Sequence, residues 1–460
     1  MFSKLFLKNF KAFDELNIGL RPITLLLGPN NSGKSSIIAA LRLIVQTIES
    51  LDPDVPLLLN GAMGDMGTFR DIVFGNHRGR PLEIAFSIND TDKGVKPGNE
   101  KMPSYWSQLS NETIELKLFY KFRSKRRELI LEGTELKRSG RILFKTTYSP
   151  DSERQLIERI GDQIIPSALK ASLTRALRMQ NFLPTISTVF FQISKDSAAQ
   201  SFFSDDIEHN SRDVGRVSRM IARTLENTDY IGAMRVPPSR VYAYTGEKRR
   251  RIGASGENAA NILAMDAMRG GTRSQKIAEA ASNWLKQAGI AENLSIDSTS
   301  DRFYEIRVKH PLTKEIENLA DVGLGNSQIM PVLVGGYSLG RGSTYLIEEP
   351  EIHLHPKAQA ELGSFLLDLY NNGVQTIAET HSEHLIVRLQ QYIADRKISP
   401  DDVQIYYVYP HGDKKEVKSL HMDSDGMFTV DWPEGFFPER LEEAKKLAKI
   451  RYQKQAQGQD

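Results

Sequence analysis

Four residues near the start of the chain have the spacing of a phosphate-binding loop: Gly28, Gly33, Lys34 and Ser35. A stretch of apolar or β-favouring residues, 24–27, precedes them and a run with helical spacing follows, which is the strand–loop–helix context of a P-loop. Backbone N–H groups in such a loop surround phosphate oxygens, and the helix dipole adds to the attraction. We expect Lys34 to reach the β- and γ-phosphates of a nucleotide and the Ser35 hydroxyl to ligate Mg²⁺.

The competing interpretation of this loop is a solvated Gly-Asn turn, which the strand before it and the helix after it disfavour. We expect every residue of the loop to contact the nucleotide: Gly28, Pro29, Asn30, Asn31, Ser32, Gly33, Lys34, Ser35 and Ser36. A phosphate-binding loop occurs in kinases, GTPases and many other proteins. Motifs in the distant half of the chain are therefore needed to identify the class of protein.

Two adjacent carboxylates, Glu348 and Glu349, follow the apolar stretch 344–347. Ligands of open α/β sheets bind at the carboxyl ends of the strands. A carboxylate pair there can divide the work, one orienting the Mg²⁺ shell and the other polarising the attacking water. Like charges so close raise one pKa unless a metal ion neutralises them. The alternative is an acidic strand-to-loop turn.

A histidine, His381, lies just after a second apolar stretch, 374–378. A neutral imidazole at this edge can hydrogen-bond the γ-phosphate or the attacking water. The alternative is a helix-capping turn, in which Thr380 or Ser382 caps the next helix.

A glycine-rich loop, 321–328, precedes an apolar helix. A loop that leads into a helix N-terminus can bind an anion. By itself the pattern is weak, because most such loops are turns.

The composition is that of a globular protein, with 460 residues, 40% hydrophobic and 26% charged. The length fits two or three domains. A net charge of +2 gives no overall attraction to nucleic acid. The absence of cysteine excludes disulfides, thiolate metal sites and a cysteine nucleophile. Lysines interrupt the first apolar stretch and no run is long enough to span a bilayer, so we expect a cytoplasmic protein without membrane contact.

Periodicity predicts an α/β fold in which a long insertion separates the two halves of the core. Strands are predicted at 4–8, 16–20, 23–27, 82–88, 112–122, 128–132, 142–148, 294–297, 303–308, 344–347, 374–378, 404–409 and 416–421. Helices are predicted at 37–50, 157–164, 167–179, 212–228, 257–268, 274–288, 357–369, 382–391 and 437–451. The predicted domains are a core half with an antiparallel β region, a helical insertion, the second core half and a small tail: 1–150, 151–290, 291–410 and 411–460.

Taken together, these pieces resemble ABC-type ATPases of the SMC- and RecF-like group, within the AAA ATPases. In chain order they match the P-loop, signature loop, Walker B strand and switch histidine of that family. The closest resemblance is to the ATPase modules of overcoming-lysogenization-defect proteins, without their nuclease domain. Three further stretches support it: Lys8-Asn9-Phe10-Lys11, Tyr230-Ile-Gly-Ala-Met-Arg235 and Trp432-Pro-Glu-Gly-Phe436.

The resemblance implies ATP and Mg²⁺ as ligands and a head-to-tail dimer in which two copies share each nucleotide. It implies catalytic roles for Lys34, Glu349 and His381, and metal binding by Ser35 and Glu348. Further nucleotide contacts would come from Asn9 and Lys11 of the same copy and from Gly325, Ser327 and Gln328 of the other. His355 and Pro356 fall where the family's dimer-contacting D-loop lies.

The sequence departs from the family pattern in three places. Glu348 stands where Walker B usually has aspartate, and Gly325 stands where the signature usually has serine. The stretch 61–74, which should carry the glutamine of a Q-loop, contains none. Asp71 or water is the expected substitute as a metal ligand.

Several other features have an ordinary explanation. His353 and His355 have the spacing of a metal pair, but no third ligand is evident. The basic runs 125–127 and 248–251 could contact DNA or RNA, although such runs are usually solvated loops. The segment 423–426 resembles half of a nuclease centre but is predicted to be a turn, because too little chain follows for that domain.

The leading hypothesis is an ATP-hydrolysing switch that forms at least a dimer and controls a separately encoded nuclease or toxin-like effector in anti-phage defence. The alternative is a RecF-like DNA repair ATPase that clamps duplex DNA. A third hypothesis, a nucleotide-gated scaffold without hydrolysis, is disfavoured by the presence of Lys34, Glu349 and His381.

Overall fold

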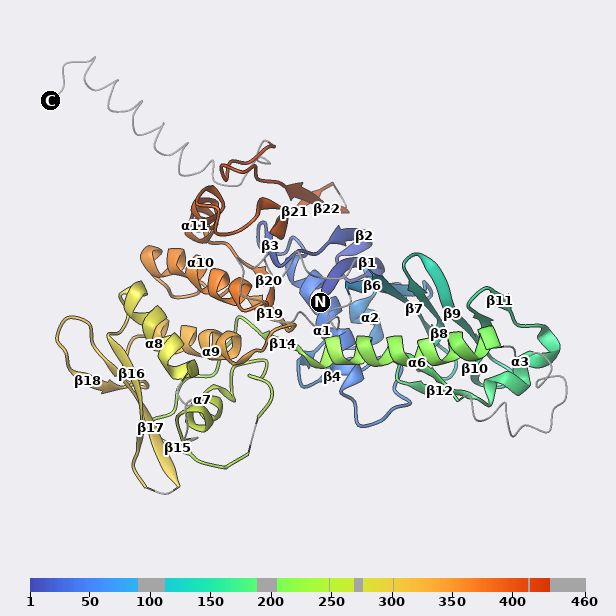
Figure 1. Cartoon of the computed structure of the whole chain (residues 1–460), viewed down its shortest axis with the longest axis horizontal. Helices are drawn as coiled ribbons and strands as arrows, with labels where there is room; N and C mark the ends of the chain where they lie inside the picture. Colours follow the sequence, from blue (N-terminus) through green and yellow to red (C-terminus); the bar gives the residue numbers. More distant parts are fainter. Residues whose placement is uncertain are drawn as a thin grey trace, which may run out of the picture.

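The computed structural model describes residues 1–89, 112–187, 205–247, 249–268, 276–300, 302–412 and 414–430. Within them, a central sheet is flanked by a long antiparallel sheet on one side and by helices with a smaller sheet on the other (Figure 1). The predicted tail helix 437–451 and the stretch 432–436 lie outside the described residues.

The central sheet has six strands in the order β14-β19-β20-β3-β21-β22. Their bounds are Thr228–Ile231, Thr344–Glu348, Gln375–Glu379, Ile23–Leu27, Val403–His411 and Lys414–Leu420. The first five are parallel and β22 pairs antiparallel with β21. The P-loop strand β3 therefore lies between two strands from the far half of the chain, as a split core requires.

Each face of this sheet belongs to a different hydrophobic core. Leu26 of β3 packs in one core with α1 (Lys34–Ile48) and the antiparallel sheet. Its neighbours Leu25 and Leu27 pack in the other core, which contains α9 (Leu324–Ser338), α10 (Pro356–Asn371) and α11 (Glu383–Ala394). Alternate side chains of a strand point to opposite faces, and both faces of a parallel sheet are covered, so β3 is buried throughout.

The antiparallel sheet has eight strands in the order β11-β10-β9-β8-β7-β6-β1-β2. Their bounds are Gln163–Ile164, Arg154–Ile160, Arg141–Ser149, Glu128–Arg138, Thr113–Arg123, Leu82–Asn89, Phe2–Phe10 and Phe13–Gly19. Helix α6 (Asp205–Glu226) runs along this sheet from the centre of the molecule to the right of Figure 1. The β1–β2 hairpin leads directly into β3, so it lies close to the P-loop.

The remaining elements are short or belong to the smaller sheet at the lower left of Figure 1. That sheet comprises β15 (Tyr242–Ala243), β16 (Asn293–Ser298), β17 (Phe303–Lys309) and β18 (Ile316–Asn318), with α7 (Ala259–Met268) and α8 (Lys276–Ala288) beside it. Two further hairpins are present. One pairs β4 (Asn60–Gly61) with β5 (Gly64–Asp65), and the other pairs β12 (Leu177–Gln180) with β13 (Leu183–Ile186). The short helices are α2 (Phe69–Ile72), α3 (Ser167–Thr174) and the 3-10 turns Phe74–Asn76 and Pro400–Asp402.

The predicted fold class is confirmed: a mixed sheet containing the P-loop strand, an antiparallel β region, and helices between the two halves of the core. The helix predicted at 157–164 is wrong, because this segment forms β10 and β11. A register shift between Ile157 and Arg159 places both Ile157 and Ile160 in the core. Because of this bulge, two buried residues of one strand are three positions apart, which is the spacing that predicts a helix. The helix predicted at 167–179 ends at Thr174, and β12 follows.

Candidate active site

The P-loop joins the carboxyl end of β3 to the N-terminus of α1. Gly28 has φ 138°, and a Cβ atom there would lie 2.0 Å from the carbonyl oxygen of Val408. Gly33 has φ 110°, and its Cβ would lie 2.8 Å from the Cβ of Ala12 on the β1–β2 turn. Only glycine fits these two positions, and the helix begins with no side-chain cap on its N–H groups. The start of α1 therefore has N–H groups without a side-chain cap, which can bind an anion, and contact of the loop with a nucleotide stays a prediction.

The ammonium of Lys34 is buried within this loop. Its Nζ donates to the carbonyl oxygens of Gly28 and Pro29, both at 2.9 Å. It also lies 3.5 Å from Oε1 of Glu379. The other carboxylate oxygen of Glu379 accepts a hydrogen bond from Ser35 Oγ at 2.7 Å. One carboxylate thus contacts both P-loop side chains that were predicted to bind phosphate and metal.

Sequence reasoning missed Glu379. The available signal was the polar end of the predicted strand 374–378, from which only His381 was chosen. Glu379 is 4% exposed and ends β20, the strand that pairs directly with β3. Burial raises the pKa of its carboxyl group, while Ser35 and Lys34 oppose the rise. A buried carboxylate in direct contact with a P-loop is the main addition that the structure makes to the site.

Glu349 and His381 converge on the same place. Ligand atoms of Glu349, Glu379 and His381 lie within 4.8 Å of one another, the one such group of three among the described residues. Glu349 has φ 45°, in the left-handed region that side chains rarely occupy, and its N–H donates to the carbonyl of Glu379 at 2.8 Å. Strained backbone of this kind is typical of functional sites. Burial and the Lys34 charge lower the pKa of His381, which favours the neutral imidazole.

Glu348 faces a different partner. Its Oε1 lies 3.3 Å from the Arg42 guanidinium of α1, and Tyr230 of β14 also hydrogen-bonds its carboxylate. The Arg42 guanidinium stacks over the Tyr230 ring at 3.9 Å from its centroid and donates to the carbonyl of Met63. Burial raises the pKa of Glu348, against the effect of Arg42. The role of Glu348 in metal binding stays a prediction.

The signature residues Gly325, Ser327 and Gln328 lie inside the first two turns of α9, not in the loop before it. A Cβ at Gly325 would lie 2.5 Å from the carbonyl oxygen of His353. The start of α9 therefore contacts, within one chain, the segment just before the predicted D-loop residues His355 and Pro356.

A buried arginine, Arg235, joins this helix to the carboxylate loop. It donates to the carbonyls of Glu348 at 2.8 Å, Glu349 at 3.1 Å and Gln328 at 3.4 Å. At 7% exposure it cannot contribute to a nucleic-acid surface, and burial lowers the pKa of its guanidinium. Sequence reasoning gave Arg235 no part in the site.

Asn9 and Lys11 flank the P-loop through the β1–β2 turn. The Asn9 amide donates to the carbonyls of Arg80 and Pro81, at 3.3 and 3.1 Å, so it fixes the turn. Lys11 is half-buried, and burial followed by the nearby Arg42 charge lowers the pKa of its ammonium. Nucleotide contact by these two residues stays a prediction.

Other polar residues singled out in the sequence have structural roles. The Asp71 carboxylate accepts from the N–H and hydroxyl of Thr68, both at 2.7 Å, and caps α2. His355 is the N-cap of α10, its ring accepting from Ala358 N at 3.4 Å. Asp423 closes the predicted turn by accepting from Asp425 N at 2.9 Å. These contacts give all three residues a structural role, and metal binding by Asp71 stays a prediction.

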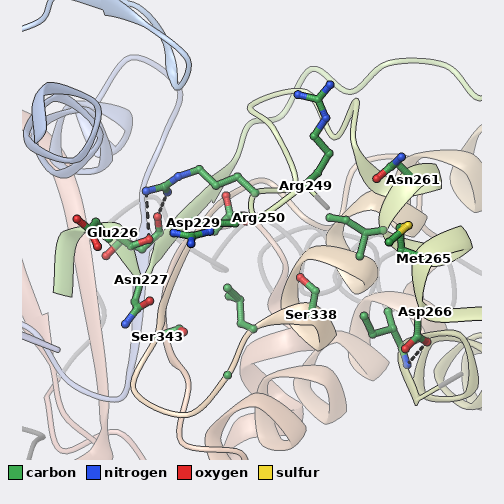
Figure 2. A pocket seen from close by; sticks show the side chains of 16 residues that line it. Glu226, Asn227, Asp229, Arg249, Arg250, Asn261, Met265, Asp266, Ser338 and Ser343 are labelled. Atoms are coloured by element: carbon green, nitrogen blue, oxygen red, sulfur yellow. Dashed lines mark hydrogen bonds between the residues drawn. The ribbon is translucent and has the colours of Figure 1, made fainter. Parts of the chain in front are cut away.

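A cavity of about 550 Å³ lies at the amino ends of the strands of the central sheet, away from the P-loop (Figure 2). Asn227 and Ser343, just before the amino ends of β14 and β19, line it together with Arg249 and Arg250. Arg251 of the same basic run is ion-paired with Glu49 and donates to the carbonyl of Thr228. The P-loop does not line this cavity.

The residues at the P-loop fit a nucleotide with its metal ion. The start of α1 has N–H groups without a side-chain cap, and around it lie an imidazole and two kinds of oxygen ligand, a hydroxyl and two carboxylates. Mg²⁺ prefers oxygen ligands of this type. A family described as AAA ATPase domain matches residues 1–214 and 260–386.

The chain belongs to the AAA ATPase domain family. In this AAA ATPase, the first matched segment contains the P-loop, and the second contains α9, the carboxylate pair and His381. Residues 398–447 match a second family, described as a protein of unknown function (DUF3696). No curated protein matches this AAA ATPase. None of its described helices is long and apolar enough to cross a membrane.

Three solved structures of SMC proteins are similar to this AAA ATPase. An SMC head bound to the C-winged helix domain of ScpA has 14% identity and a TM-score of 0.42, over 92% of this chain and 98% of that one. The SMC head domain from Thermotoga maritima has 10% identity and a TM-score of 0.40, over 92% and 99%. An SMC head domain with an extended coiled coil, bound to the C-terminal domain of ScpA derived from Pyrococcus furiosus, has 14% identity and a TM-score of 0.41, over 98% and 99%.

Proposed function

We propose that this AAA ATPase is a switch that binds and hydrolyses ATP with Mg²⁺, closes as a head-to-tail dimer and controls a separate effector protein. The observation that carries the proposal is the convergence of Lys34, Glu349 and His381, from three elements distant in sequence, at one edge of the central sheet. A solvated P-loop-like turn has no reason to gather these groups.

Each residue of this group has a distinct task. Lys34, released from its two carbonyl partners, neutralises the β- and γ-phosphate oxygens. Glu349 takes the proton of the attacking water, and neutral His381 holds that water or the γ-phosphate by a hydrogen bond. Mg²⁺, when bound, supplies charge neutralisation at the phosphates. The left-handed backbone of Glu349 fixes the direction of its carboxylate.

The second copy would supply the first turn of α9. No side chain caps the start of this helix and no acidic residue lies in its first turn, so its N–H groups can bind an anion. We assign Gly325, Ser327 and Gln328 to the γ-phosphate of the partner's nucleotide. Segment 151–290 and the tail 411–460 are assigned to contacts with other subunits or with an effector of the nuclease or toxin type, in anti-phage defence.

Phosphate release by the wild type and by Glu349→Gln tests the hydrolysis step. We expect release by the wild type and a strong reduction in the variant, and equal rates would show that Glu349 is not the base. Co-purification with the product of the adjacent gene tests effector control. A chain that acts alone in cells, with no bound neighbour, contradicts that part.

One observation favours the alternative, a RecF-like DNA clamp. Four arginines on α6, spaced four, three and four residues apart, share one exposed face: Arg212, Arg216, Arg219 and Arg223. Such a stripe can follow a phosphate backbone. This function requires ATP-dependent, salt-sensitive binding of duplex DNA that Arg216→Glu weakens. Absence of binding by Glu349→Gln with ATP at low salt rejects it.

A further inference from the structure

We propose that Glu379, rather than Glu348, supplies the carboxylate facing Mg²⁺ at the nucleotide site, and that Glu348 instead anchors α1 through Arg42. The inference rests on the proposed ATPase function and deepens it by assigning the metal side of the site. It also identifies the oxygen ligand missing from the stretch 61–74, which contains no glutamine.

The first support is the contact with Ser35. The hydroxyl expected to ligate the metal donates to Glu379 Oε2 at 2.7 Å. A carboxylate that accepts from a metal-binding hydroxyl lies next to the ion, where it can ligate it directly or through a bound water. Glu379 reaches this place from a buried strand end, so the main chain holds it in position.

The second support is the strand order. β20 pairs directly with β3, whereas β19 lies one strand further away. The register places Glu348 level with Glu379, and Glu379 level with Leu26 just before the P-loop. Neighbouring strands are about 4.8 Å apart, so Glu379 starts one strand spacing from β3 and Glu348 starts two. The Glu348 carboxylate instead meets the guanidinium of Arg42.

The third support is that Glu348 is already engaged. Arg42 and Tyr230 hold its carboxylate, and Arg42 is itself fixed by the Tyr230 ring and the Met63 carbonyl. Turning Glu348 toward the metal would leave a buried guanidinium without its charge partner. Lys34, by contrast, gains the β- and γ-phosphate oxygens as partners when the nucleotide binds, so Glu379 can turn to a metal ion without leaving the ammonium unpaired.

The test compares nucleotide affinity with and without the metal. A fluorescent, non-hydrolysable ATP analogue is titrated into the full chain in Mg²⁺ and in EDTA, and the ratio of the two affinities measures metal linkage. We expect Glu379→Gln to lower this ratio by about 10–100-fold, the usual effect of losing a ligand's partner group. Glu348→Gln should leave the ratio unchanged but lower the unfolding temperature.

The outcomes separate this inference from the function on which it rests. If Glu379 only competes with the nucleotide for Lys34 and Ser35, Glu379→Gln raises affinity in both buffers with the ratio unchanged, and the inference is overturned. A ratio lowered by Glu348→Gln alone also overturns it, while the ATPase proposal stands. Failure of the wild type to bind in either buffer overturns both.

Two further variants guard against a folding defect. Glu379→Asp keeps the charge with a shorter reach, and we expect a ratio between those of the wild type and Glu379→Gln. Arg42→Met removes the proposed anchor of Glu348, and we expect reduced thermal stability with an unchanged ratio. A ratio in Glu379→Asp as low as that of Glu379→Gln, together with a lowered ratio in Arg42→Met, contradicts the assignment.

Discussion

The backbone N–H of Glu349 donates to the carbonyl oxygen of Glu379 at 2.8 Å, which joins the ends of β19 and β20 one residue beyond the strand pairing. The bond keeps Glu349 in its left-handed conformation. The proposed base and the proposed metal-side carboxylate therefore hold each other in place through the main chain, and side-chain substitution at either leaves this link intact.

Glu349→Gln is expected to reduce phosphate release by about 10²–10⁴-fold, because an amide cannot take a proton from water. ATP binding should persist, since Lys34 and the loop are unchanged. Single-turnover hydrolysis and equilibrium binding on the same preparation check this, and simultaneous loss of binding would assign Glu349 to the nucleotide instead.

Lys34→Ala is expected to abolish ATP-driven association as well as hydrolysis. The buried ammonium is the one cation within ion-pair distance of Glu379 among the described residues, so its removal also leaves that carboxylate without a charge partner. Light scattering with and without ATP measures association. Lys4→Ala, at an exposed lysine of β1 to which no nucleotide contact is assigned, serves as the lysine control. A wild type whose mass does not change with ATP would contradict the dimer.

Arg42→Ala is expected to lower the free energy of unfolding by about 3–5 kcal/mol, because it leaves the Glu348 carboxylate buried without its charge partner. Adding Glu348→Gln should recover part of that loss. Urea unfolding of both single variants and the double variant completes a double-mutant cycle. Strictly additive effects would show that the pair contributes no coupling.

Asp229 gives the protein a pH dependence of known sign. Burial raises the pKa of its carboxyl group from 3.8 to about 6, against hydrogen bonds from Ile252 and Tyr230. Between these values the folded state binds more protons than the unfolded state, so this group's contribution to stability falls as pH rises.

Asp229→Asn removes this titration. The unfolding free energy of the variant, relative to the wild type, should therefore improve by about 2–3 kcal/mol from pH 4 to pH 7. Urea unfolding at both pH values measures the change. The amide of the variant cannot accept one of the two hydrogen bonds. The loss lowers the unfolding free energy equally at pH 4 and pH 7, so it cancels from the change between the two pH values. A difference that does not vary with pH would place the pKa of Asp229 near its ordinary value.

Local pattern sufficed for the P-loop, for Glu349 and His381 at strand ends, and for most strands and helices. It failed where the outcome depends on which strands become neighbours. Glu379 matters because β20 lies beside β3, and no local feature of the sequence specifies that order.

The contacts of Arg42 and Arg235 were missed for the same reason, since their partners are distant in sequence. The bulge at Ile157 could not be foreseen either, because it depends on the register with β9. Functional residues within one segment could be predicted from the sequence, whereas contacts between residues from several distant segments could not.

The position of β3 between β20 and β21 also governs how the protein is made. Its neighbour β20 is synthesised about 350 residues later, a delay of about 20–70 s at 5–20 residues per second. During that time Ile23–Leu27, apolar except for Thr24 and buried throughout in the finished protein, has no strand to pair with. A ribosome-associated chaperone that shields this segment should raise the soluble yield, and slower translation should lower it.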